Sequence, residues 1–593
     1  MIDPHRLQLA YQTARRDLLA QRCDAGHWLG RLSSSALATA TATSALALVA
    51  EHSTDESRRR AGRELAAQGV ASLAAAQNDD GGWGDTGRSA SNIATTMLAQ
   101  AALHLAGGAE GHAGALARAQ AYIERQGGTE ALRRRYGVDK TFAVPILTNG
   151  ALAGLVPWRE VAPLPFEAAA LPFPLLRWLR LPVVSYAVPA LVAIGQARFF
   201  HQRPRNPLTW LVRRCAVGPS LRALQRMQPA GGGYLEAVPL TSFVVMSLAA
   251  TGRADHPVTR RGMRFLLDSV RDDGSWTIDT NLATWNTTLS VQALAAATGE
   301  VGALGCTDWL LDCQHDERHP FTNAAPGGWG WSDAGGAVPD ADDTAGALLA
   351  LAVLEKSASQ SRRERSHAEA AGGIQWLLDL QNRDGGWPTF CRGWGKLPFD
   401  RSGADLTAHA LRALAAWQGA GPSAERMDAA IAAGFDFLAK HQRPDGSWVP
   451  LWFGNQHHPD EENPVYGTAR VLLAYRDFGK IDSDAAQRAL RWLCASRCVD
   501  GGWGCGLPDR GASTVEETAV ALEALLSDPR NPAVRAVLSE GLQWLVCCVE
   551  QGRHREPAPI GFYFAKLWYY ECLYPMIFTV AALGRAVQAL DQS

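Results

Sequence analysis

A short acidic run holds the residues of this chain that are best suited to acid–base chemistry. Asp340, Asp342 and Asp343 fall in the sequence PDADDTA, at 339–345. Carboxyl groups this close repel one another when ionised, so we expect the cluster to raise at least one pKa and to retain a proton as a coupled set. A carboxylic acid that keeps its proton can act as a general acid. The alternative stays open: the same residues can cap a helix predicted to begin near Thr344, which would lower their pKa values.

A second polar pair lies on a segment rich in alanine and leucine. Asp405 and His409 are spaced four positions apart in ADLTAHALRALAAW, at 404–417. At helical spacing they share a face, where Asp405 can orient the imidazole and His409 can hydrogen-bond a carboxyl group of the acidic run. A positively charged His409 would then polarise the acid. From the residues alone, a satisfied core histidine is the more common outcome on such a helix.

The elements that would position these residues repeat along the chain. Tryptophan is unusually frequent, with 20 Trp against 17 Phe and 11 Tyr, and a motif Q-x-x-x-G-x-W accounts for much of the excess. Full copies span 77–83, 381–387 and 442–448, and partial copies end at Trp276, Trp329, Trp503 and Tyr234. The spacing fits two helices and a loop per unit, and the intervening segments have apolar residues at helical spacing. We therefore predict an α/α barrel whose repeat tryptophans are structural.

Composition bounds the class of protein. A length of 593 residues argues for at least two domains, and 47% hydrophobic residues fit a large globular chain. A net charge of −2 gives no electrostatic signal for nucleic acid, which we exclude as a partner. The N-terminus lacks the apolar core of a secretory signal, and the apolar stretch at 181–195 is too short to span a bilayer. Eleven scattered Cys indicate reduced thiols in a cytosolic protein.

In its motifs and their order the chain resembles the squalene-hopene and oxidosqualene cyclases, the class II terpene cyclases with QW repeats. Beyond the repeats and the two polar motifs, the segments that carry the resemblance are QGGTEA at 126–131, ATWNTTLSVQAL at 283–294 and VYGTARVLL at 465–473. It implies an all-α fold of two α/α barrels with a central cavity. Residues 1–27 and 280–593 would form the catalytic barrel, and residues 28–279 a second barrel inserted in it.

The resemblance also implies a reaction. A family member protonates a linear polyprene, here expected to be squalene or a similar C30 chain, and closes it to a polycyclic product without metal or organic cofactor. The middle aspartate of the acidic motif, Asp342, would donate the proton, with Asp340, Asp343 and the Asp405/His409 pair around it. Tyr466 is expected within reach of the cluster. Cyclisation of a shorter prenyl diphosphate or of a meroterpenoid precursor is the alternative within the same class.

Aromatic faces can stabilise the resulting carbocation without quenching it. The residues expected by resemblance to line the cavity are Trp285, Trp331, Phe390, Trp452, Tyr186, Trp329, Tyr563 and Tyr570. Core packing is the alternative for each. The loop at 391–402 departs from the family and carries Arg392, Lys396 and Arg401, which either face solvent or meet a polar or diphosphate head group. The last repeat, at 550–575, lacks the G-x-W motif, and the segment at 33–42 lacks an acidic residue expected there.

A hydrophobic substrate implies contact with a membrane. The segment 167–200 pairs dense apolar residues with Arg177, Arg180 and Arg198, a pattern suited to interfacial binding. By resemblance we expect monotopic attachment to the cytoplasmic side of the cell membrane. Interior packing is the alternative for this segment, and the sequence leaves a homodimer open.

Two other classes compete with a cyclase. A protein prenyltransferase β-subunit is also an α/α barrel, but it needs a zinc site, and Cys494, Cys498 and Cys505 lack paired ligand spacing. A non-catalytic toroid would use the acidic run as a helix cap. The Asp405/His409 pair, in register with that run, argues against the toroid.

Overall fold

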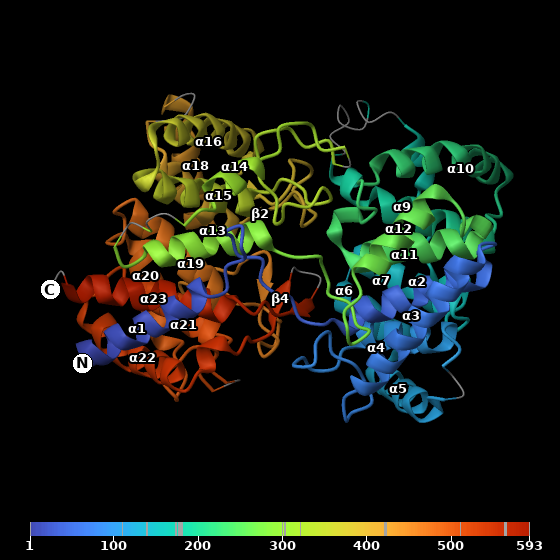
Figure 1. The fold of residues 1–593 in the computed structure, drawn as a ribbon, viewed down its shortest axis with the longest axis horizontal. Helices are drawn as coiled ribbons and strands as arrows, with labels where there is room; N and C mark the ends of the chain where they lie inside the picture. The colour runs from blue at the N-terminus through green and yellow to red at the C-terminus, as the bar shows by residue number, and fades with distance from the viewer. Residues whose placement is uncertain are drawn as a thin grey trace.

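The computed structural model describes residues 2–108, 111–137, 140–171, 175, 182–298, 301, 304–320, 322–419, 424–509, 512–562 and 566–591. These residues form two lobes of helices (Figure 1). Helix α1 and the helices from α13 onward build one lobe, and helices α2 to α12 build the other. The predicted all-α fold of two α/α barrels is confirmed. The domain boundaries after residue 27 and before residue 280 fall in loops and stay a prediction.

Six inner helices of the first lobe, here called the catalytic lobe, contact one another in order around a closed ring. They are α13 (Ala283–Ala295), α15 (Ala341–Leu354), α17 (Ala404–Ala416), α19 (Pro464–Asp477), α21 (Val515–Leu525) and α23 (Tyr574–Asp591). Shorter or amphipathic helices surround them: α1 (Pro4–Leu19), α14 (Thr307–Asp312), α16 (Gln360–Leu380), α18 (Ala424–His441), α20 (Asp484–Ala495) and α22 (Pro532–Glu550). Helix α20 illustrates the pattern, because its buried residues Ala486, Ala489, Leu490 and Leu493 follow helical spacing.

In the described part of the inserted lobe, five inner helices form a ring that closes where α2 meets α11. The inner helices are α2 (Ala36–His52), α4 (Ile93–Leu105), α7 (Lys140–Leu152), α9 (Pro182–His201) and α11 (Val238–Leu248). The outer helices are α3 (Glu56–Ala75), α5 (Ala113–Gln126), α6 (Gly128–Tyr136), α10 (Pro207–Met227) and α12 (Pro257–Asp268).

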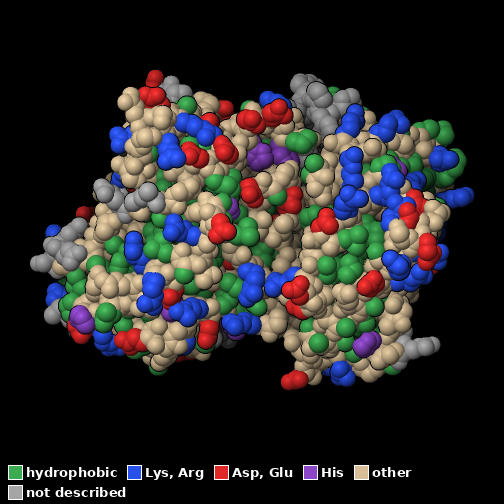
Figure 2. Space-filling view, in the orientation of Figure 1, with side chains coloured by type: hydrophobic (Ala, Val, Ile, Leu, Met, Phe, Trp, Pro, Cys, Tyr) green, Lys and Arg blue, Asp and Glu red, His purple; other side chains and the backbone are tan. Residues whose placement is uncertain are grey.

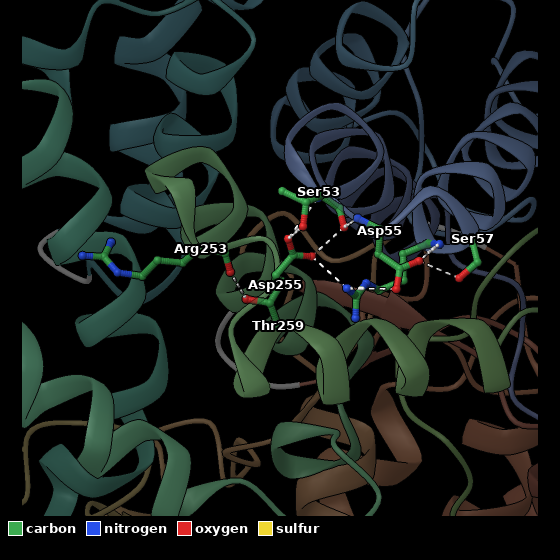
Figure 3. Close-up of polar contacts among 8 residues, drawn as sticks. Ser53, Asp55, Ser57, Arg253, Asp255 and Thr259 are labelled. Atoms are coloured by element: carbon green, nitrogen blue, oxygen red, sulfur yellow. Dashed lines mark hydrogen bonds and ion pairs between the residues drawn. The ribbon is translucent and has the colours of Figure 1, made fainter.

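A polar network fastens this closure (Figure 3). Asp255, just before α12, accepts hydrogen bonds from Ser53 Oγ at 2.6 Å and from the Thr54 backbone N–H at 2.9 Å. Arg58 Nη2 lies 3.0 Å from the same carboxylate. The hydrogen bonds from Ser53 and Thr54 lower the pKa of Asp255 to about 2. The network therefore stays charged at neutral pH and ties the first helix pair of the ring to the last.

Hydrogen bonds from the motif residues fix the repeat turns. In the turn at 381–387, Gln381 Nε2 donates to the Ala430 carbonyl at 2.9 Å, and Trp387 Nε1 donates to the Leu377 carbonyl at 2.8 Å. The Trp387 backbone N–H donates to Thr407 Oγ1 at 3.0 Å on the next inner helix. The backbone bond to a threonine recurs at Trp28–Thr287, Trp83–Thr96, Tyr234–Thr241, Trp276–Thr39, Trp329–Thr344, Trp448–Thr468 and Trp503–Thr518. Trp28 belongs to a unit that the motif search missed.

The predicted structural role of the repeat tryptophans agrees with their burial. Trp28, Trp83, Trp276, Trp329, Trp387, Trp448 and Trp503 are all fully buried. Each tryptophan ring packs under an outer helix, and its backbone N–H bonds the next inner helix around the ring. Each turn therefore fixes the orientation of two helices. Truncating a buried tryptophan to alanine typically costs about 3–5 kcal/mol.

Short strands join the lobes at the end of the catalytic barrel (Figure 1). β1 (Trp387–Pro388) pairs with β2 (Ser402–Gly403), and β4 (Ile560–Phe562) pairs on either side with β3 (Phe453–Gly454) and β5 (Leu567–Tyr569), all antiparallel. The Trp568 backbone N–H donates to Asp85 of the inserted lobe at 2.8 Å. Arg135 of that lobe lies 3.0 Å from Glu461.

Short helical turns complete the described chain: 3₁₀ turns η1 (Trp158–Glu160), η2 (Phe166–Ala170), η3 (Tyr234–Glu236), η5 (Glu355–Ser357) and η6 (Arg553–Arg555), and a π turn η4 (Ala249–Arg253). Among the described residues, α22 is the one helix long and apolar enough to cross a membrane by length and composition. It packs against α1, α20 and α21 in the outer ring of the catalytic lobe.

Candidate active site

The repeat register brings four predicted site residues together at one end of the catalytic barrel. Each of the four stands in the first turn of an inner helix, two positions before the threonine whose Oγ1 accepts the backbone N–H of a repeat tryptophan. They are Trp285 on α13, Asp342 on α15, Asp405 on α17 and Tyr466 on α19. They line a cavity of about 20 Å³ together with Leu289, Gln292, His409, Arg412 and Arg470. A cavity of this size has room for about one water molecule.

The acidic run both caps its helix and presents an acid. Asp340 is the N-cap of α15, and its Oδ1 accepts from the Asp343 backbone N–H at 2.8 Å. That cap leaves Asp342 in the first turn, where its Oδ1 lies 2.6 Å from His409 Nδ1. The two interpretations of the sequence therefore describe different members of one cluster. The helix begins at Ala341, slightly earlier than expected.

Burial outweighs the capping effect on the carboxyl groups. It raises the pKa of Asp340 to about 7, although the Asp343 N–H opposes that rise. Burial, with the nearby charge of Asp340, also raises the pKa of Asp343 well above its ordinary value. One oxygen of Asp343, Oδ1, is buried without a hydrogen-bond partner. The cluster can thus retain a proton at neutral pH, as the sequence predicts.

His409 and Asp405 differ in two respects from expectation. Asp405 does not orient the imidazole: its Oδ1 accepts instead from the Leu451 backbone N–H at 3.0 Å, because the turn after the Trp448 repeat reaches into the barrel end. Burial lowers the pKa of His409, and the bond to Asp342 offsets this in part. Burial therefore favours the neutral imidazole over the positively charged form, and the Nδ1–H tautomer of that neutral ring can donate to Asp342 Oδ1. Burial also raises the pKa of Asp405 to about 7.

One aromatic group surrounds the acid. Trp285 stands edge-on to His409 at 5.9 Å between ring centres, and it stacks on Phe453 at 6.4 Å. Its Nε1 donates to Tyr574 Oη at 3.1 Å, and Tyr574 Oη lies 2.8 Å from Tyr569 Oη. Sequence reasoning missed Phe453, Tyr569 and Tyr574. For the two tyrosines the signal was present in WYYECLYP, but the absence of G-x-W there left the register of the last unit open.

A second aromatic group lies toward the inserted lobe, around Phe390. The Phe390 ring centre is 5.0 Å from Tyr186, 6.3 Å from Trp331 and 5.9 Å from Trp452. Trp452 Nε1 donates to Thr389 Oγ1 at 2.7 Å. The structure thus gathers three of the predicted cavity aromatics around a fourth, Phe390, with edges and faces turned toward one another as aromatic packing prefers.

The remaining predicted residues are placed elsewhere. Trp329 occupies the structural repeat position, since its Nε1 donates to the Leu310 carbonyl at 2.8 Å and its ring is fully buried. Tyr570 is half-buried beside Arg88 of the inserted lobe, whose guanidinium lies 5.5 Å from its ring centre. Tyr563 lies outside the described residues. Tyr569 and Tyr574, and not Tyr570, therefore belong to the aromatic group around Trp285.

The charged loop faces solvent. Arg392, Lys396 and Arg401 are exposed, and the loop is organised by buried Asp400, which accepts from the backbone N–H groups of Trp394, Gly395 and Leu397. This placement favours the solvated-loop interpretation over a head-group site.

A metal-ligand geometry occurs away from Cys494, Cys498 and Cys505, the cysteines whose spacing argues against a zinc site. Among the described residues, ligand atoms of His458, Asp460 and Glu462 lie within 4.8 Å of one another. Both Glu462 oxygens accept from Arg443, at 2.8 and 2.7 Å, so an arginine already neutralises that carboxylate. Cys498 and Cys505 are buried, and Cys494 is half-buried.

Comparison with known proteins identifies the class and then the family. A helical double barrel with this acid site is a terpene cyclase of class II. Residues 282–588 match the squalene-hopene cyclase C-terminal domain and residues 11–187 match the N-terminal domain, so the chain belongs to the squalene-hopene cyclase family. This membership decides against a prenyltransferase β-subunit.

Individual relatives are distant. Enfumafungin synthase efuA from Hormonema carpetanum is 27% identical over 92% of this chain and 45% of its own length. The terpene cyclase-glycosyl transferase fusion protein fsoA from Humicola fuscoatra is 27% identical over 96% of this chain and 49% of its own. The chain thus spans about half the length of these two. The squalene–hopene cyclase from Bradyrhizobium diazoefficiens is 27% identical over 73% of this chain and 76% of its own.

Proposed function

We propose that this protein protonates the terminal alkene of a linear polyprene, squalene or a similar C30 chain, and closes it to a polycyclic triterpene. The observation that carries the proposal is the 2.6 Å contact between Asp342 and His409, set among aromatic rings at the end of a barrel. An alkene is a very weak base, so its protonation needs a carboxylic acid whose conjugate base is stabilised as it forms.

In the proposed first step, protonated Asp342 gives its proton to an alkene carbon, and the alkene π electrons form the new C–H bond. Negative charge develops on Asp342, and the His409 Nδ1–H bond to Oδ1 strengthens because its acceptor becomes ionised. A neutral His409 suffices for this role. The cation left on the substrate is then attacked by the next alkene, ring by ring.

Aromatic faces stabilise the travelling cation in this proposal. The group around Trp285 lies beside the acid, where the first ring would form, and the group around Phe390 lies toward the inserted lobe. Each cation–π contact contributes roughly 0.5–2 kcal/mol, and none of these rings offers a nucleophile strong enough to trap the cation. Because the cavity at Asp342 measures only about 20 Å³, substrate entry requires side chains to move apart.

We also propose that the protein is monotopic, attached to the cytoplasmic side of the cell membrane by α10 and its surroundings. The described residues Leu171, Leu175, Phe200, Leu208, Trp210, Leu211 and Val212 are exposed apolar side chains there, and Leu208 is 69% exposed. Lys and Arg side chains gather over this lobe (Figure 2), among them exposed Arg203, Arg205 and Arg214. Exposed apolar residues flanked by basic ones favour an interface with anionic lipid. Arg177 and Arg180 lie outside the described residues.

The test of the function compares substrates with one matched variant. Detergent-solubilised protein is incubated with squalene, oxidosqualene and geranylgeranyl diphosphate, each with and without EDTA, beside Asp342→Asn. A cyclic triterpene that forms in EDTA and disappears in Asp342→Asn supports the proposal. If only geranylgeranyl diphosphate is turned over, the substrate is a prenyl diphosphate and not a C30 chain. If turnover survives Asp342→Asn, Asp342 is not the proton donor.

A further inference from the structure

A charged strip runs along the axis of the catalytic barrel behind the acid. Arg412 of α17 pairs with Asp477 of α19 at 2.7 Å, and Arg476 lies 2.8 Å from the same aspartate. Arg470, one turn after Tyr466 on α19, lines the cavity that also exposes Asp342 and His409. Arginine is seldom buried unless it is paired, so unpaired charge on a barrel axis calls for an explanation.

Two arginines of the strip, Arg470 and Arg476, each have a guanidinium nitrogen that is shut off from solvent without a hydrogen-bond partner among the described residues. Of the two, Arg470 is the one that lines the cavity, and its unpaired atom is Nη2. Its guanidinium stacks 4.8 Å from the Tyr466 ring centre and 5.0 Å from the Phe578 ring centre, which fixes its plane. A held donor that lacks an acceptor in the resting protein is what a site prepared for developing negative charge requires.

The group that gains negative charge beside Arg470 is Asp342. The two side chains face the same cavity of about 20 Å³, and the Asp342 carboxylate is one of the charges that raise the pKa of Arg470 against the effect of burial. The Arg470 charge in turn lowers the pKa of His409, after burial and together with Arg412. Arg470 therefore supplies the fixed positive charge that a neutral His409 cannot.

We propose that Arg470 is a positioning residue for the proton donor: its guanidinium stabilises the carboxylate that Asp342 becomes after proton transfer, and its free Nη2–H then faces an acceptor across the cavity. This inference rests on the proposed function of Asp342. The residue acts through Asp342 and touches no substrate atom.

Other ionisable groups also face Asp342 and stay constant in the test. The groups that interact electrostatically with Asp342 are Asp340 just before α15, Asp343 on α15, Asp405 and His409 on α17, Tyr466 on α19 and Tyr569 of β5, and Arg412 lines the same cavity. Further out, Glu523 on α21 interacts with Arg470, Tyr574 on α23 with Tyr466 and Tyr569, and Arg585 on α23 with Arg412 and Arg476. Removing the positive charge of Arg470 makes the carboxylate form of the proton donor less stable relative to its protonated form. In the pH profile, kcat should then fall at a higher pH on the alkaline side. The plateau value of kcat should drop, since the acid is weaker.

The experiment compares Arg470→Met and Arg470→Lys with Arg476→Met. Arg476 lies on the same helix and is also largely buried, but it pairs with Asp477 and does not line the cavity. For Arg470→Met we expect the midpoint of the alkaline fall in kcat to shift to higher pH by about one unit. The plateau kcat should fall about tenfold, with KM little changed. Arg470→Lys should restore most of the plateau kcat. Arg476→Met should leave the midpoint of the alkaline fall in kcat unchanged.

A readout independent of turnover separates this inference from the proposed function. Infrared difference spectra across a pH titration, with Asp342→Asn to assign the band, report whether the Asp342 carboxyl keeps its proton to higher pH in Arg470→Met. If the Asp342 carboxyl band shifts in Arg470→Met but the protein turns over no polyprene, the electrostatic role of Arg470 is supported and the proposed function is wrong. The role of Arg470 is overturned if Arg470→Met shifts neither the Asp342 carboxyl band nor the alkaline fall in kcat. Equal effects of Arg470→Met and Arg476→Met on these two readouts would overturn it as well.

Discussion

Replacing His409 tests whether the acid is activated by a hydrogen-bond donor or by a positive charge. In His409→Leu the 2.6 Å bond to Asp342 is lost. A hydrogen bond to a charged group contributes about 1.5–3 kcal/mol, and this one reaches that strength only when Asp342 is ionised. Converted at about 1.4 kcal/mol per tenfold, kcat should fall roughly 10- to 150-fold, with KM nearly unchanged.

His409→Asn distinguishes the two mechanisms. The amide nitrogen of asparagine is two bonds from Cβ, as Nδ1 is in histidine, so asparagine keeps an N–H donor of similar reach and cannot become positively charged. Because burial lowers the pKa of His409, we expect the neutral donor to be the active form, so His409→Asn should retain most of the plateau kcat at pH 7 and 8. The assay is single-turnover product formation by gas chromatography–mass spectrometry, with thermal melts to verify folding. If His409→Asn loses as much activity as His409→Leu, the positively charged form is required and our reasoning is wrong.

Four further outcomes are expected. Thr407→Val leaves the repeat tryptophan's N–H unpaired and should lower the free energy of unfolding by about 1–3 kcal/mol in urea titrations, whereas Thr407→Ser should lose less. Tyr574→Phe removes the acceptor of Trp285 Nε1, so its triterpene products should become a broader mixture on chromatography while its melting temperature falls. Asp405 has a folded pKa near 7, above the ordinary 3.8, so its contribution weakens the fold as pH rises from about 4 to 7; Asp405→Asn should therefore be more stable than wild type at pH 8 and not at pH 4. Leu211→Asp should weaken sedimentation with anionic vesicles about tenfold, and unchanged binding would contradict attachment through α10.

The sequence predicted those features of the site that depend on local periodicity. Asp342, Asp405 and Tyr466 converge because each stands at the same distance from a repeat threonine, and a repeated local bond fixes that distance. The pairing of His409 with the acidic run follows from the same register. The double barrel is predictable for the same reason, since each repeat turn specifies the packing of its own helix pair.

Features that depend on closure of the barrel were not predictable. The partner of Asp405 is a backbone N–H at Leu451, and Trp285 meets Tyr574, which lies 289 residues further along the chain. The charge state of His409 follows from burial, which spacing cannot report. Tyr570 was a candidate because the motif of the last repeat is missing, and a one-residue change of register moves a side chain to another face.

The contact of α1 with α23 has a consequence for biosynthesis. Helix α1 ends at Leu19, and the helix it packs against begins at Tyr574. At 5–20 residues per second, the ribosome needs roughly half a minute to two minutes to make the intervening chain. The ring of the inserted lobe, from Ala36 to Asp268, is complete long before that and can fold while synthesis continues. During this interval the buried face of α1, with Leu7, Ala10 and Leu18, lacks its contact with α23, so nascent chains should depend on chaperones until α23 emerges.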